Sequence, residues 1–161
     1  MTRRVRSNRM RAVQVTQKHI ERVRELLEAA SLILEERAIA HDQSKFDPVE
    51  SEPLQRMQDL IDAEGQAPYG SAEYRRRTAI LGPMLAHHYA NNSHHPEHYD
   101  NGVDGMCLFD VVEMFFDWKA ASERGEESAM NIEAACKRFK VSPQLASIFR
   151  NTADRLGFKH T

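Results

Sequence analysis

The amino-acid sequence predicts an all-α fold, a single compact bundle of about six to seven helices over residues 1–161. Apolar residues recur at steps of three and four along most of the chain, which is the period of a helix. No stretch of useful length alternates apolar and polar residues as a strand would. A length of 161 residues is typical of one domain, so we expect one core.

The first helix is expected over residues 12–36, where an apolar stripe also carries His19. A short helical piece over 38–46 should end before Pro48, because the residue that precedes a proline disfavours helix. A helix over 71–91 must accommodate Gly82-Pro83, where we expect a kink. The other helices are expected over residues 53–65, 106–125, 126–139 and 142–157, and a loop over 91–105.

Composition limits the classes of protein to which the chain can belong. Twenty-two Lys and Arg oppose 24 Asp and Glu, and the net charge of −2 argues against a surface devoted to polyphosphate. Cys107 and Cys136 are too few for a disulfide framework. No apolar run approaches the roughly 18 residues of a membrane span, and the start lacks the apolar core of a secretion signal. We expect a cytoplasmic protein without a membrane partner.

Histidine is the unusual component, with five of its eight copies between residues 87 and 98. His87 and His88 close a predicted helix, and His94 and His95 lie in the loop that follows. Four protonated imidazoles so close together would repel one another, whereas neutral imidazole is a common metal ligand. The cluster therefore predicts a metal site, in preference to a solvated loop that binds metal adventitiously.

Two other stretches carry residues of the same chemistry. His41 and Asp42 are adjacent and can both reach an ion at the flank of a helix, although a surface histidine beside a helix-terminal carboxylate is the simpler reading of that pair alone. Asp110, Glu113 and Asp117 share one helical face beside apolar residues. A buried carboxylate needs a cation or a donor, so this stripe favours a metal over a solvated outer face.

The order of these residues resembles the HD superfamily of metal-dependent phosphohydrolases, in which a His, a His-Asp pair, often further histidines and a final Asp lie on helices. The strings HDQSKF, HHYANNSHHPEH and EMFFDW are similar to those of an HD-like family found in bacteria and their phages, over roughly residues 15–125. The resemblance implies one or two divalent metal ions. Ligation by His and Asp suits Mn, Fe, Co, Ni or Zn.

The resemblance also implies roles for individual residues. The implied metal ligands are His19, His41, Asp42, His88, His94, His95 and Asp117, with Asp42 placed to bridge two ions. Lys45 would contact the phosphate, and Glu113 would orient a ligand or protonate the leaving group. Asp110 is the alternative to Asp117. Which member of each histidine pair binds metal is open, and His88 is favoured over His87 because it continues the apolar stripe of the predicted helix. His87 and Asn92 would bind substrate or act as alternate ligands.

We therefore expect an enzyme that hydrolyses a small phosphate ester, with a nucleotide as the favoured substrate. An HD-fold di-iron oxygenase and a non-catalytic metalloprotein are the alternatives. A third is a nucleic-acid-binding module at the basic C-terminal end, for which a solvated face is the simpler explanation. The basic residues 1–11 indicate a frayed end, or an arm that faces phosphate in a homo-oligomer.

Overall fold

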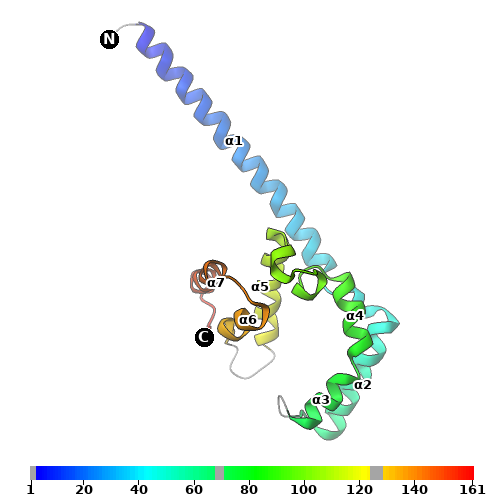
Figure 1. The fold of residues 1–161 in the computed structure, drawn as a ribbon. Coiled ribbons are helices and arrows are strands. Elements are labelled where there is room, and N and C mark those ends of the chain that lie inside the picture. Colours follow the sequence, from blue (N-terminus) through cyan, green and yellow to red (C-terminus); the bar gives the residue numbers. More distant parts are fainter. Residues whose placement is uncertain (1–2, 68–70, 124–128) are drawn as a thin grey trace. The chain divides into compact units, whose positions relative to one another are not determined.

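The computed structural model describes residues 3–67, 71–123 and 129–161, with side chains from Met10 onward. These residues form helices and no strand, with one isolated bridge between Met130 and His160, so the predicted all-α class is confirmed (Figure 1). The α-helices are α1 (Arg3–Ala40), α2 (Pro48–Glu64), α3 (Ala72–Ala79), α4 (Gly82–Asn91), α5 (Leu108–Ser122), α6 (Ile132–Phe139) and α7 (Pro143–Leu156). Short 3-10 helices are η1 (Gln43–Phe46), η2 (Pro96–His98) and η3 (Gly102–Gly105).

The chain divides into two units, Met1–Ile39 and Ala40–Thr161. The first consists almost entirely of α1, an uninterrupted helix that is longer at both ends than the expected 12–36 (Figure 1). It contains neither Gly nor Pro and is rich in Arg, Glu, Leu and Ala, all good helix formers. It takes in most of the basic segment 1–11, of which residues 1–2 lie outside the described residues. That both units form one domain stays a prediction.

The piece expected as a helix over 38–46 is broken in the structure. Residues up to Ala40 complete α1, and Gln43–Phe46 form η1. Asp42 separates them with φ 56° and ψ 18°, in the left-handed region that Asp tolerates better than most residues. The chain therefore changes direction at the predicted His-Asp pair.

Helix α2 begins five residues earlier than expected, at Pro48 instead of Pro53. Pro48 suits the first helical position, because its missing N–H would have no partner there. The earlier start places Glu50 in the first turn of the helix, where its side chain is completely buried. Gly65 ends the helix with φ 74°, as its position in the sequence indicates.

The kink expected at Gly82-Pro83 is a complete break. Helix α3 ends at Ala79 and α4 starts at Gly82, with Pro83 in its first turn. Proline lacks the N–H that a continuous helix would use, so a new helix begins. Helices α2 and α4 pack side by side within the second unit (Figure 1).

The hydrophobic core of the second unit is built by α5, α6 and α7. Its buried members are Met114, Phe115, Met130, Ile132, Phe149 and Ala153. Helix α7 matches the prediction, with Ser142 capping the N–H of Leu145 and Gly157 ending it in a left-handed conformation. Helix α6 is shorter than expected and starts after the cap residue Asn131. The stop expected at Gly125 lies outside the described residues.

No described helix combines the length and the apolar character that a membrane crossing requires. Helix α1 has the length but carries charged residues throughout.

Replacing Phe149 by Ala should destabilise the second unit by about 3–5 kcal/mol, because the ring is 3% exposed and its removal leaves a cavity. The ring stacks on Phe115 with centroids 5.5 Å apart and meets the edge of Trp118. Urea denaturation measures the effect. The neighbouring Ile148→Ala, at a side chain that is 51% exposed, is the control and should change stability by less than about 0.5 kcal/mol. Equal effects of the two variants would contradict this description of the core.

Candidate metal centre

Asp42 occupies the middle of the candidate site. Its left-handed backbone turns the chain between α1 and η1, and its side chain is half-buried. Carboxylate atom Oδ2 accepts a hydrogen bond from Lys45 Nζ. The other oxygen, Oδ1, lies 3.4 Å from His88 Nε2 and 3.6 Å from His94 Nε2. One carboxylate therefore faces imidazoles from two later segments of the chain.

The histidine-rich loop after α4 is folded back by hydrogen bonds of its own. The Asn92 side chain donates to the carbonyl of His88 at 2.8 Å and to Ser44 Oγ at 2.7 Å. The beginning of the loop is buried, with Asn92 7% and His94 2% exposed, whereas Glu97, His98 and Asp100 further along are exposed. The burial of His94 favours a built site over a fully solvated loop.

Glu113 on α5 orients two of the imidazoles. Its Oε1 lies 2.8 Å from His41 Nδ1 and 3.0 Å from His94 Nδ1. With Nδ1 engaged, both rings direct Nε2 toward Asp42, at 3.3 Å for His41 and 3.6 Å for His94. A carboxylate on the far nitrogen is the usual support for a metal-binding histidine, since it sets the tautomer and the ring orientation.

Glu50 on α2 gives the same support to two other histidines. Its oxygens lie 2.7 Å from His87 Nδ1 and 2.9 Å from His88 Nδ1. Sequence reasoning did not find this residue. An acidic side chain in the first turn of a helix is usually explained by the helix dipole, and only its position eight residues after Asp42 sets it apart. The packing of α2 on α4 is what brings it to the histidines.

Among the residues that the structure describes, two groups of side chains could hold a metal ion, each with ligand atoms within 4.8 Å of one another. One group is Asp42, His88, His94 and His95, and the other is His41, Asp42, His94 and Asp117. Within the described part of the chain, Asp42 Oδ1 and His94 Nε2 are buried without a hydrogen-bond partner. A buried carboxylate oxygen beside a buried imidazole nitrogen is costly unless a cation satisfies both, so the donor set fits a divalent ion.

Comparison with known proteins gives a match to a protein family. The family described as "Family of unknown function (DUF5662)" matches residues 8–155. The chain belongs to this family. No significant match was found among curated proteins or among solved structures. Membership of the HD superfamily stays a prediction, with which the His and Asp groups of this DUF5662 chain are compatible.

The charges of the DUF5662 site are set by its hydrogen bonds and its burial. Hydrogen bonds to Asp42 and then Glu113 raise the pKa of His41 to about 10. Burial raises the pKa of Asp42, but the hydrogen bonds from His41 and Lys45 outweigh it and hold this pKa well below its usual range. Burial, and then the charges of His94 and His88, lower the pKa of His95 to about 3. His95 is therefore neutral at pH 7, the form that ligates metals.

Most of the predicted site residues meet in the second unit. The two ligand groups contain His41, Asp42, His88, His94, His95 and Asp117. Lys45 and Glu113 bond directly to members of these groups. Because Glu113 already engages two imidazoles, its position suits orientation of ligands better than protonation of a leaving group.

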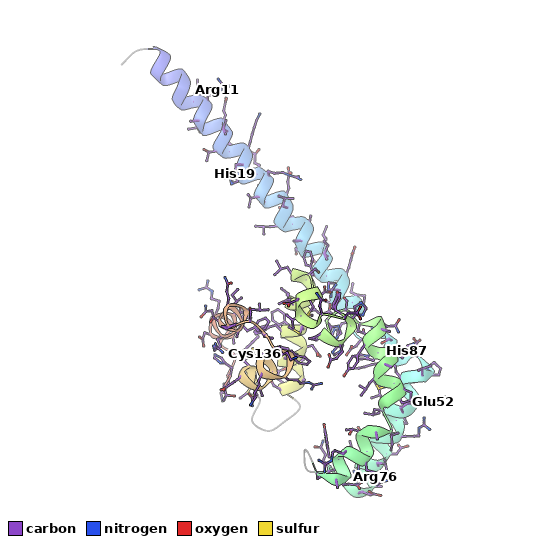
Figure 2. All side chains as sticks on the ribbon, in the orientation of Figure 1. Arg11, His19, Glu52, Arg76, His87 and Cys136 are labelled. Atoms are coloured by element: carbon purple, nitrogen blue, oxygen red, sulfur yellow. The ribbon has the colours of Figure 1, made fainter. Side chains whose placement is uncertain are left out.

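The remaining predicted residues are placed elsewhere or act as supports. His19 lies on α1, in the first unit, with an exposed side chain, and neither ligand group includes it (Figure 2). Its assignment as a ligand stays a prediction. His87, on α4, is held by Glu50 and is also outside the ligand groups. Asn92 fastens the loop through hydrogen bonds to Ser44 and His88.

Asp110 holds the loop on α5 and is in neither ligand group, whereas Asp117 lies 3.8 Å from His41 Nε2. Asp110 accepts hydrogen bonds from Ser93 Oγ at 2.6 Å, Tyr99 Oη at 2.9 Å and the N–H of Cys107 at 2.8 Å. Burial raises the pKa of this carboxyl, but hydrogen bonds from the Cys107 thiol, from Ser93, from the Cys107 N–H and from Tyr99 outweigh it, so the pKa falls well below its usual range.

Asp110→Asn should therefore destabilise the protein by about 2 kcal/mol near pH 7, because hydrogen bonds to a buried carboxylate are lost. The folded-state pKa lies below the unfolded value of about 3.9, so this stability is complete above that value and is lost as the pH falls. The difference between wild type and variant should shrink below about pH 4, as measured by urea denaturation at several pH values. Asp104→Asn, at an exposed site, is the control. A difference that grew toward low pH would contradict the assignment.

Glu50→Gln should weaken the binding of Mn²⁺ or Zn²⁺ by about 10- to 100-fold, because it removes the carboxylate that orients His88. Titration against a metal-binding dye measures the affinity, and thermal unfolding checks that the variant is folded. Glu52→Gln on the same helix is the matched control, since Glu52 is exposed (Figure 2). Unchanged metal affinity in folded Glu50→Gln would show that Glu50 does not support the site.

Proposed function

We propose that this DUF5662 chain is a metal-dependent phosphohydrolase that acts on a small phosphate ester, most simply a nucleotide. The observation that carries the proposal is that both ligand groups share Asp42 and His94, next to a lysine that bonds to Asp42. A shared carboxylate suits two neighbouring ions, the arrangement used by many phosphatases. The proposed cofactor is one or two ions of Mn, Fe, Co, Ni or Zn.

A divalent ion in such a site lowers the pKa of water to about 7 and withdraws charge from phosphoryl oxygens. The residues of the chain determine how it is held. Glu113 and Glu50 engage Nδ1 of His41, His94 and His88. Of the three Nε2 atoms, that of His94 has no hydrogen-bond partner, that of His41 faces Asp42, and that of His88 lies 2.9 Å from His95 Nε2. An ion would replace these contacts as the partner of the Nε2 atoms. Asp42 contributes the charge that balances a cation in this buried place.

Lys45 is the residue best placed to bind the phosphate. Its ammonium group bonds to Asp42, and about a third of its side chain is exposed, so it can exchange that partner for a phosphoryl oxygen. In the reaction, an oxygen of water bonds to phosphorus, the ester P–O bond breaks, and the leaving oxygen takes a proton, which yields inorganic phosphate and an alcohol. The positive charge of Lys45 would offset the charge on the equatorial oxygens.

The proposal is tested by measuring bound metal in the purified protein and by assaying phosphate release from a panel of nucleotides and other phosphate esters. We expect release with at least one of Mn²⁺, Co²⁺, Ni²⁺, Fe²⁺ or Zn²⁺, and none after chelation. Metal-loaded protein that releases no phosphate with any of these ions would contradict the proposal. A coloured, iron-loaded protein that ignores phosphate esters would favour the di-iron oxygenase instead.

Two substitutions separate metal binding from turnover. Asp42→Ala should lose metal and activity together, because Asp42 belongs to both ligand groups. Lys45→Ala should keep the metal and lose at least about 100-fold in kcat, the size typical of one lost transition-state donor. Metal content and phosphate release are measured on the same preparations. Lys137→Ala, at an exposed lysine of α6, is the control for removing a positive charge. A fully active Lys45→Ala would disprove the role of Lys45.

A further inference from the structure

A cavity of about 580 Å³ adjoins the candidate metal centre. It is lined by residues of α4, the following loop, α5 and α6, among them His95 and Asp117. These two side chains belong to different ligand groups, so the cavity reaches both. Its volume lies within the roughly 300–1,000 Å³ of typical small-molecule sites. A molecule whose phosphoryl group is held by the ligand groups would therefore have room to extend into this cavity.

Two aromatic side chains line the cavity and together form its aromatic wall. Trp118 and Phe139 line it and stack on each other, with ring centroids 5.7 Å apart and planes 10° apart. Trp118 also contacts the buried ring of Phe149 edge-on, at 5.6 Å between centroids. The core of the second unit thus holds this wall in place. Flat aromatic walls bind planar rings of many kinds by stacking.

A charged pair adds polar groups to the same cavity. The guanidinium of Arg138 lies over the Phe139 ring, 4.8 Å from its centroid, and donates to Glu97 Oε1 at 3.2 Å. Arg138 and Glu97 both line the cavity. A guanidinium offers several donors in one plane and a carboxylate offers acceptors, so the pair can recognise the polar edge of a planar ring.

We propose that this cavity binds the leaving group of the ester and that the leaving group carries a planar heteroaromatic ring of nucleobase type. The ring stacks against the Trp118–Phe139 wall, and Arg138 and Glu97 hydrogen-bond its edge. The role as a leaving-group site rests on the proposed function, whereas the binding of a ring in the cavity does not. Stacking of one base contributes roughly 5- to 150-fold in affinity.

The experiment uses tryptophan fluorescence of the metal-loaded chain of 161 residues. The chain has one tryptophan, so the signal reports on Trp118 in the cavity wall alone. The probes are adenosine, uridine and ribose, none of which is a phosphate ester. We expect at least one nucleoside to quench the fluorescence saturably and ribose to leave it unchanged. Quenching by neither nucleoside, or equal effects of ribose, would overturn the proposal.

A matched pair of variants locates the binding. Ala121 lines the cavity, whereas its neighbour Ala120 does not, and both are exposed on α5. Ala121→Leu fills part of the cavity and should weaken nucleoside binding at least 10-fold, whereas Ala120→Leu should leave it within twofold. Leucine is nearly as good a helix former as alanine, so both variants should fold. Equal affinities of the two variants would overturn the assignment of the cavity.

Failure of this proposal and failure of the proposed function give different results. Nucleoside binding that is lost in Ala121→Leu, without hydrolysis of any ester, supports the ring site and contradicts the hydrolase. Hydrolysis of esters without quenching by nucleosides, or with equal rates in Ala121→Leu and Ala120→Leu, supports the hydrolase and overturns the ring site.

Discussion

The candidate site of this protein depends on carboxylates that hydrogen-bond to Nδ1 of histidines. Glu113 holds His41 and His94, and Glu50 holds His87 and His88. A buried carboxylate is tolerated only when donors surround it, and a carboxylate on Nδ1 sets the orientation of the imidazole ring. The hydrogen bonds that offset the desolvation of Glu50 and Glu113 therefore also orient the imidazole rings. They direct the Nε2 atoms of three of these rings toward Asp42.

The helices serve this arrangement by bringing four separate stretches of chain together. The turn at Asp42 follows α1, Glu50 comes from α2, the histidine loop follows α4, and Glu113 comes from α5. Asn92 and Asp110 hold the loop from its two sides, Asn92 to Ser44 in η1 and Asp110 at the start of α5. The loop contains the short helices η2 and η3, and these side-chain hydrogen bonds tie it to η1 and α5.

The chemistry proposed for the molecule divides between a polar centre and an aromatic cavity. The centre combines a shared carboxylate, neutral imidazole and a lysine, the set of groups that suits a divalent ion and a phosphate. The cavity beside it offers a stacked pair of rings and one Arg–Glu pair. His95 and Asp117 belong to the ligand groups and also line the cavity, so the two features are contiguous.

The sequence by itself determined the all-α class, the boundaries of α7 and most of the residues that meet at the site, because helical period, caps and histidine clustering are local signals. The sequence did not determine which partner each carboxylate binds. Asp110 and Asp117 share a stripe, yet the first ties down a loop and the second joins a ligand group. Glu50 could not be found at all, because its function arises only when α2 packs on α4 and buries it against two histidines. Only the tertiary structure determines the roles of these carboxylates, because each role depends on partners that are distant in sequence. It also depends on burial, which removes water from the carboxylate and makes those partners necessary.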